Sequence, residues 1–223
     1  MRWTLPNILT VLRLIAAPGV AIMFLYFARP YADWFAMLLF ILAAITDYID
    51  GYLARAWKQE TKFGAMMDPI ADKAMVVIAL LVITGFSGMN PWILLPATVI
   101  FFREIFVSGL REFLGAKAGQ LKVTNLAKYK TFAQMLALTV LFARGLFEHY
   151  FGMHTYGMDV DLVNDIFAGN IEDLLGIRWK YYGAIWSWYG GVTLLWVAAG
   201  LTLITGIDYY RKALPYLREA DTP

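Results

Sequence analysis

Four aspartates interrupt a chain that is otherwise strongly apolar. Asp47 and Asp50 lie three residues apart, Asp68 and Asp72 lie four apart, and apolar sequence flanks both pairs. Residues at these spacings share one face of a helix, so two neighbouring helices can direct two carboxylates each to one point. Carboxylates that close repel one another unless they are protonated or bind cations. Oxygen-only ligands suit Mg²⁺ or Mn²⁺, so the pattern predicts a site for two metal ions of the kind that serves phosphoryl chemistry.

The composition indicates a membrane protein. Of the 223 residues, 60% are hydrophobic and only 16% are charged, with a mean hydropathy of +0.58. A soluble domain carries about 25% charged residues, and here the apolar residues form long runs. We therefore predict an all-α polytopic membrane protein with a single domain over residues 1–223. The net charge of +2 gives no reason to expect a nucleic-acid partner, and the absence of cysteine excludes disulfides.

Six apolar segments are long enough to cross a bilayer, which takes about 20 helical residues. The first contains Pro18, a predicted kink, and Arg13, whose charge argues against a cleaved signal peptide. The predicted spans cover residues 8–27, 34–53, 69–85, 91–110, 126–147 and 181–207.

The basic residues predict the orientation of these spans. Only Arg29, Arg144, Arg178 and Lys180, of 19 lysines and arginines, fall on one side. Because cytoplasmic loops carry the excess of positive charge, both termini are predicted to be cytoplasmic. Residues 148–180, which are acidic and aromatic, then form an extracytoplasmic insertion between the fifth and sixth spans. Both aspartate pairs, and the predicted active site with them, lie at the cytoplasmic face of the membrane.

Small residues accompany the aspartates. Gly51, Ala54 and Gly64 leave space for close approach, either by a ligand or by another helix. Arg55 is placed to orient a carboxylate or hold a phosphate, unless it is only a positive-inside anchor. Carboxylates inside a membrane protein can also mark an ion path, which makes a divalent-cation transporter an alternative. That alternative is disfavoured because the carboxylates collect at one face and the middles of the last two spans carry almost no polar residues.

The arrangement resembles the signature of the CDP-alcohol phosphotransferases, D-x2-D-G-x2-A-R-x8-G-x3-D-x3-D. The resemblance implies a six-helix membrane enzyme, commonly a homodimer, in which the aspartates hold divalent metal. Such an enzyme moves a phosphatidyl-type group from a CDP-linked lipid to an alcohol and releases CMP. It also implies that Asp72 is the base that activates the acceptor hydroxyl, and that the two glycines, Ala54 and Arg55 border the nucleotide. The chain matches all eight fixed positions: Asp47, Asp50, Gly51, Ala54, Arg55, Gly64, Asp68 and Asp72.

A group of cations suggests that the acceptor alcohol carries a phosphate. Arg103 and Arg111 lie in FFREIFVSGLREF, and Lys128 and Lys130 lie in AKYKTFAQ. Arginine offers a bidentate fork to a phosphate and lysine adds a point charge. Arg103 lies partly within the apolar layer and needs a partner, which is the substrate phosphate, its neighbour Glu104 or an aspartate.

Within the family, four segments are similar to the bacterial members that use sn-glycerol 3-phosphate. The segments are LPNILTVLRLIAAPGVAIMF, GAMMDPIADK, REIFVSGLRE and KYKTFAQ. This similarity implies transfer from CDP-diacylglycerol to sn-glycerol 3-phosphate in the bacterial cytoplasmic membrane. It also implies that Asn7, Thr10 and Arg13 lie near the lipid-nucleotide site. A member that uses inositol phosphate is the alternative, and nothing functional carries over to residues 148–180.

Overall fold

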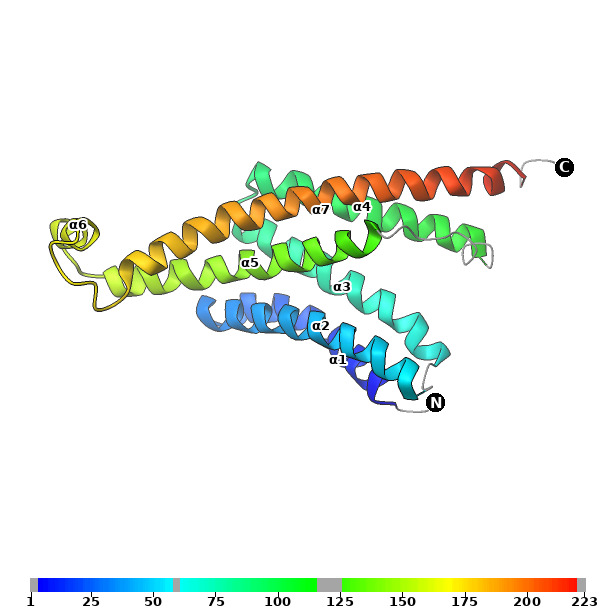
Figure 1. Ribbon diagram of the computed structural model, residues 1–223, viewed down its shortest axis with the longest axis horizontal. Coiled ribbons are helices and arrows are strands. Elements are labelled where there is room, and N and C mark those ends of the chain that lie inside the picture. The colour runs from blue at the N-terminus through cyan, green and yellow to red at the C-terminus, as the bar shows by residue number, and fades with distance from the viewer. Residues whose placement is uncertain (1–3, 58–60, 116–125, 220–223) are drawn as a thin grey trace.

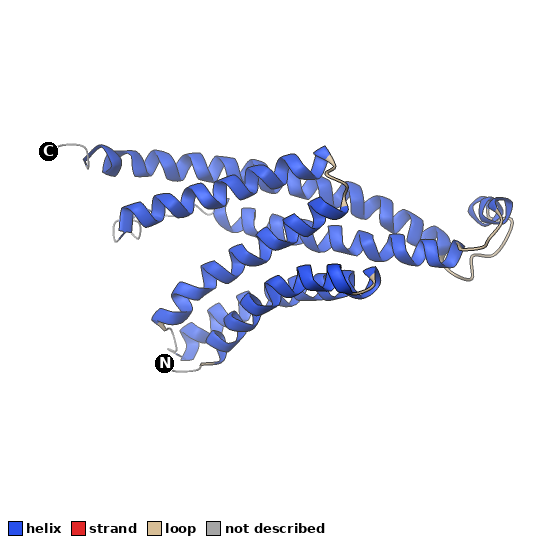
Figure 2. Cartoon of the chain, turned by 180° about the vertical axis from the view of Figure 1, so that it is seen from behind, coloured by secondary structure: helices blue, strands red, loops and turns tan. Residues whose placement is uncertain are grey.

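The computed structural model describes residues 4–57, 61–115 and 126–219, and of residues 47–57 it describes only the helical backbone. Throughout this part of the chain the secondary structure is helical, with loops between the helices (Figures 1 and 2). The all-α prediction is thus confirmed. The helices are α1 Leu5–Tyr26, α2 Arg29–Trp57, α3 Lys62–Phe86, α4 Pro91–Leu114, α5 Leu126–Thr155, α6 Val160–Ala168 and α7 Ile177–Glu219.

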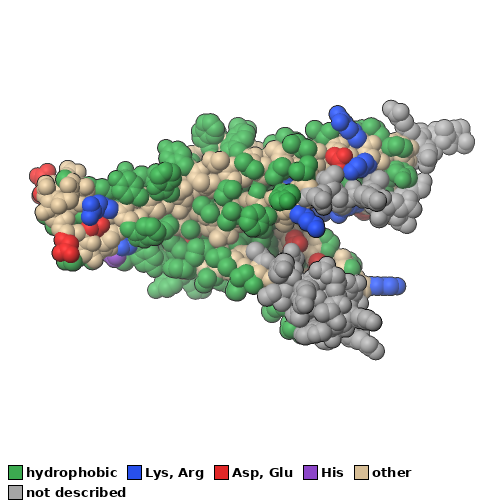
Figure 3. Space-filling view, in the orientation of Figure 1, with side chains coloured by type: hydrophobic (Ala, Val, Ile, Leu, Met, Phe, Trp, Pro, Cys, Tyr) green, Lys and Arg blue, Asp and Glu red, His purple; other side chains and the backbone are tan. Residues whose placement is uncertain are grey.

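Five of the described helices are long and apolar enough to cross a membrane, namely α1, α3, α4, α5 and α7. The remaining predicted span, 34–53, corresponds to α2, which has 29 residues but is not one of these five. Charged side chains gather at the two ends of the molecule, and the visible face between them is mostly hydrophobic (Figure 3). This distribution is typical of a bundle whose middle lies in lipid.

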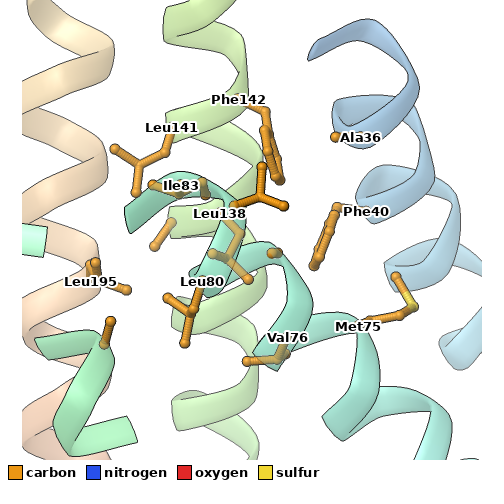
Figure 4. Close-up of a cluster of buried hydrophobic side chains, with 14 of the residues drawn as sticks. Ala36, Phe40, Met75, Val76, Leu80, Ile83, Leu138, Leu141, Phe142 and Leu195 are labelled. Carbon is orange, nitrogen blue, oxygen red and sulfur yellow. The ribbon is translucent and has the colours of Figure 1, made fainter. Parts of the chain in front are cut away.

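The bundle has one continuous apolar core. α1 packs on α3, α2 on α5, and α7 on both α4 and α5. Phe40 of α2, Met75 of α3, Leu138 of α5 and Leu195 of α7 are buried and meet at the centre (Figure 4). The helices form two arms, one of α1, α2 and α3, which carries the signature, and one of α4, α5 and α7. The apolar core joins these two arms.

The third helix begins earlier than predicted. It starts at Lys62, not near Pro69, because Thr61 caps it: the Thr61 hydroxyl accepts a hydrogen bond from the Gly64 backbone N–H at 3.0 Å. Pro69 is accommodated inside the helix. Asp68 consequently lies in the second turn of α3 and not at its start, so Asp68 and Asp72 both project from an established helix.

The last two long helices also exceed their predicted bounds. α5 continues to Thr155, beyond the predicted end at residue 147, and α7 runs for 43 residues from Ile177 to Glu219. The extension of α7 is polar and includes an ion pair between Lys212 Nζ and Asp208 Oδ2 at 2.7 Å. The prediction from apolar residues covered only residues 181–207 of α7. It missed the C-terminal part because that part continues the helix with polar residues.

The arginines predicted to face outward are each paired with a carboxylate. Asp33, which is only 1% exposed, binds Arg29 through both of its oxygens, and Gly145 of α5 lies directly against this pair. A Cβ added to Gly145 would lie 2.3 Å from Asp33 Oδ1, so only glycine allows this approach. Each carboxylate neutralises the positive charge of its arginine. These arginines therefore do not conflict with a position on the outer side of the membrane. The pairs are Arg29–Asp33, Arg144–Glu148 and Arg178–Asp173.

The two ends of the bundle differ. α1 begins and α7 ends at the same end of the bundle, whereas α6 lies at the opposite end (Figure 1). The space-filling view shows a notch at the first end, between the two arms, where Lys, Arg, Asp and Glu side chains gather (Figure 3). The signature helices meet at this end.

If the chain is the transferase that its signature predicts, replacing residues 156–172 with a short Gly-Ser linker is expected to leave the rate of transfer within a factor of about 2, because this segment lies at the end of the bundle remote from Asp68. Asp173 should be kept, since its carboxylate accepts hydrogen bonds from the backbone N–H groups of Ile177 and Arg178 at the start of α7. Activity per folded molecule, compared with that of the full-length chain, is the measurement. A monodisperse, membrane-inserted variant without activity would contradict the expectation.

Candidate active site

A polar stripe on α1 faces the start of α3. Asn7, Thr10 and Arg13 recur every three residues, which places them on one face of the helix. They are 3%, 2% and 6% exposed, although most of α1 is apolar. Buried polar groups of this kind need partners, and α3 supplies them.

Two residues of this stripe, Thr10 and Arg13, bond the two signature aspartates of α3. Thr10 Oγ1 donates to Asp68 Oδ1 at 2.5 Å. Arg13 Nη1 donates to Asp72 Oδ1 at 3.2 Å. Asp72 nevertheless keeps 47% of its side chain exposed, so it remains accessible from outside the bundle. The structure therefore brings the predicted N-terminal residues and the second aspartate pair into one site.

Gly64 allows α1 to approach α3. A Cβ at this position would lie 2.7 Å from Asn7 Oδ1 and 3.3 Å from Thr61 Oγ1. The Thr61 hydroxyl in turn donates to Asn7 Oδ1 at 2.9 Å. The space that Gly64 leaves is thus used by Asn7, which gives this glycine a packing role beside the role in nucleotide binding that the family signature implies.

The first aspartate pair lies in the last turns of α2. The helical backbone there confirms the spacing argument for Asp47 and Asp50, because residues three apart on a helix share a face. Among the described side chains, Asp68 and Asp72 form no group of three with another acidic residue or histidine. For five predicted site residues the structure describes only the helical backbone, namely Asp47, Asp50, Gly51, Ala54 and Arg55.

The predicted acceptor cations are divided by the structure. Glu104 is only 8% exposed, and its Oε1 accepts from Lys130 Nζ at 2.5 Å and from Arg103 Nη1 at 3.1 Å. Arg103 thus has the neighbour Glu104 as a partner, one of the partners expected. Arg111 and Lys128 are exposed, and the Arg111 guanidinium lies 5.3 Å from the centre of the Tyr209 ring. Arg103 and Lys130 are therefore brought together, whereas Arg111 and Lys128 are not part of that contact.

Lys73 was not predicted as a site residue, but it reaches the same region. Its Nζ donates to Ser108 Oγ of α4 at 2.5 Å. Glu104, Arg111 and Arg103 all act electrostatically on it. Two features of the sequence could have indicated it: Lys73 follows Asp72 directly, and it precedes the apolar run AMVVIALLVI. A lysine beside a carboxylate at the start of such a run is itself a candidate for a site.

Comparison with known proteins identifies similar chains over the whole length. The family model of CDP-alcohol phosphatidyltransferase matches residues 3–162. A protein of Cereibacter sphaeroides is 62% identical over 220 residues, which cover 98% of this chain and 99% of the relative. Proteins of Rickettsia bellii and Salmonella choleraesuis are 36% and 34% identical over 215 residues, covering 95% and 96% of this chain and 96% of each relative. All three carry the name CDP-diacylglycerol–glycerol-3-phosphate 3-phosphatidyltransferase.

Proposed function

This chain belongs to the CDP-alcohol phosphatidyltransferase family, and from that premise we propose how its residues perform the family reaction. The enzyme transfers the phosphatidyl group of CDP-diacylglycerol to sn-glycerol 3-phosphate, giving phosphatidylglycerol phosphate and CMP. The observation that carries this conclusion is the 62% identity over nearly the full length to a relative of that name. The reaction is a step of phospholipid biosynthesis.

The family uses divalent metal ions, and we propose two, Mg²⁺ or Mn²⁺, held by Asp47, Asp50, Asp68 and Asp72. The described half of the site fits such ions, because Asp68 and Asp72 offer carboxylate oxygens from one helix face. The hydrogen bonds from Thr10 and Arg13 orient these carboxylates, as partners of metal ligands commonly do. When bound, the ions supply positive charge that neutralises the pyrophosphate and the departing CMP.

CDP-diacylglycerol is proposed to bind between α1, α2 and α3 with its acyl chains in the bilayer. Arg13 is buried and bonded to Asp72, which holds its guanidinium at a defined position beside a proposed metal ligand, where we propose that it adds positive charge next to the pyrophosphate. Small residues at positions 51 and 54 are proposed to leave space for the nucleotide, while Gly64 gives Asn7 its place at the same site. The proposed donor site comprises Asn7, Thr10, Arg13, Gly51, Ala54, Arg55 and Gly64.

Asp72 is proposed as the base. Its half-exposed carboxylate can accept the proton of the acceptor hydroxyl, while the bond from Arg13 fixes its orientation. The hydroxyl oxygen then attacks the phosphorus that carries the acyl glycerol, and the bond to CMP breaks. Arg103, Arg111, Lys128 and Lys130 hold the acceptor's own phosphate, so that the hydroxyl is aligned with the leaving group.

The reaction is proposed to take place at the cytoplasmic face of the bacterial inner membrane. In this arrangement six helices, α2 included, cross the bilayer, and both termini are cytoplasmic. Two observations support it: α1 begins and α7 ends at one end of the bundle, and the arginines at the other end are paired with carboxylates. From the family resemblance we also propose that two chains assemble as a homodimer.

Arg111→Ala is expected to raise the KM for sn-glycerol 3-phosphate by about 10- to 100-fold, because a charge-assisted bond to phosphate is lost. The KM for CDP-diacylglycerol should stay nearly unchanged. Lys128→Ala should act in the same direction, since its side chain is also exposed. The measurement is a two-substrate titration.

Arg211→Ala is the matched control for Arg111→Ala, because Arg211 is an exposed arginine near the same end of the bundle and outside the proposed site. It should leave both KM values unchanged. If Arg111→Ala instead weakens CDP-diacylglycerol binding, the cations hold the donor and not the acceptor phosphate.

A further inference from the structure

Glu104 lies where two of the acceptor cations meet. It is a buried carboxylate in the apolar helix α4, and one of its oxygens accepts from both Lys130 of α5 and Arg103 of α4. The side chains of Arg and Lys are flexible and repel one another when they share a site. The Glu104 carboxylate between Arg103 and Lys130 fixes the positions of both side chains. Through Lys130 it also links α5 to α4.

The same turn of α4 also holds a cation from α3. Ser108 Oγ donates to the backbone carbonyl of Glu104 at 2.6 Å and accepts from Lys73 Nζ at 2.5 Å. Lys73 adjoins Asp72, the proposed base. Cations from three helices are therefore gathered around one turn of α4, and one of them comes from the helix that carries the base.

This group is not electrically balanced. Among the described side chains, Lys73, Arg103 and Lys130 carry three positive charges against the single negative charge of Glu104, which leaves an excess of two. Arg103 Nε is buried without a hydrogen-bond partner among the described residues. Buried charge needs compensation, and a phosphate monoester near neutral pH carries a charge of about −1.5 to −2. The chemistry of the group therefore fits one phosphate.

We propose that Glu104 is the positioning residue of the acceptor site, and that it aligns Arg103 and Lys130 directly and Lys73 through Ser108. This inference rests on the proposed function, since it assigns the cations to the phosphate of sn-glycerol 3-phosphate. Glu104 does not touch the substrate. It sets the place of the phosphate relative to Asp72, because Lys73 links the group to the helix of the base.

Glu104→Gln keeps the size of the side chain but removes its charge, so the cations should separate. The KM for sn-glycerol 3-phosphate is expected to rise about 10- to 100-fold, while the KM for CDP-diacylglycerol stays unchanged. The preference for glycerol 3-phosphate over plain glycerol should fall by a similar factor. Glu104→Asp, which restores the charge, should recover part of the loss.

The matched control is Glu112→Gln, the same change on an exposed residue two turns further along α4. It should leave all kinetic constants unchanged. Ser108→Ala provides a second variant that leaves Glu104 in place and releases only Lys73, so a smaller rise in the same KM is expected, about 3- to 10-fold.

Three results would overturn the proposal. A lower kcat with both KM values unchanged means that Glu104 only stabilises the fold. A lower KM for glycerol 3-phosphate means that Glu104 competes with the phosphate. If Glu104→Gln does not yield folded protein, Ser108→Ala replaces it as the test. An unchanged KM for sn-glycerol 3-phosphate in Ser108→Ala would then overturn the proposal. Failure of the proposed function is distinct, because then the unaltered enzyme would form no product from glycerol 3-phosphate.

Discussion

Asp68→Ala is expected to lower the rate of phosphatidyl transfer by about 10³-fold or more, because it removes a proposed metal ligand at the point where charge develops. It also leaves Thr10 without the carboxylate that its hydroxyl binds at 2.5 Å. A chelator should abolish the activity of the unaltered protein, and added Mg²⁺ or Mn²⁺ should restore it. Activity is measured as release of CMP from CDP-diacylglycerol.

Asp161→Ala, an exposed aspartate of α6 at the other end of the bundle, is the matched control and should leave the rate unchanged. Restoration by metal should occur in the control and in the unaltered enzyme, but not in Asp68→Ala at the same metal concentration. Full activity in excess chelator would contradict the metal site.

Asp72→Asn is expected to reduce kcat by about 10²- to 10⁴-fold, because an amide cannot take the proton of the acceptor hydroxyl. The amide oxygen can still accept from Arg13, which the carboxylate binds at 3.2 Å. Binding of CDP-diacylglycerol should therefore persist. Equilibrium binding of the donor and single-turnover rates with sn-glycerol 3-phosphate measure the two properties separately.

A metal titration separates the two roles proposed for Asp72. If the asparagine variant has lost only metal affinity, a large excess of Mg²⁺ or Mn²⁺ should restore turnover. If the proton acceptor is lost, the rate should remain low at saturating metal. Near-normal turnover of the variant without added metal would contradict both roles.

The helical placement of both aspartate pairs could be predicted, because the argument from spacing needs only a helix. The pairs Asp47–Asp50 and Asp68–Asp72 need only a helical backbone to present their carboxylates together, and the structure provides that backbone for both. The approach of α1 to α3 could not be predicted from spacing. It depends on Gly64, whose missing side chain gives Asn7 its place.

The acceptor cations illustrate the limit of such reasoning. Arg103 and Lys130 were correctly expected to lie close together, but Lys130 is 26 residues from Glu104, and its ion pair exists only because α4 and α5 place the two side chains within reach. Helix ends were misjudged for a related reason. The start of α3 depends on a cap by Thr61, and the length of α7 depends on polar residues beyond its apolar part.

The most direct test of the account offers the purified protein CDP-diacylglycerol with an equimolar mixture of sn-glycerol 3-phosphate, inositol phosphate and glycerol. The lipid products are then identified by mass spectrometry, and CMP is measured in the same reaction. The account predicts phosphatidylglycerol phosphate as the dominant lipid, formed in equal amount to CMP and only in the presence of divalent metal. Phosphatidylinositol phosphate or unphosphorylated phosphatidylglycerol as the main product would contradict it.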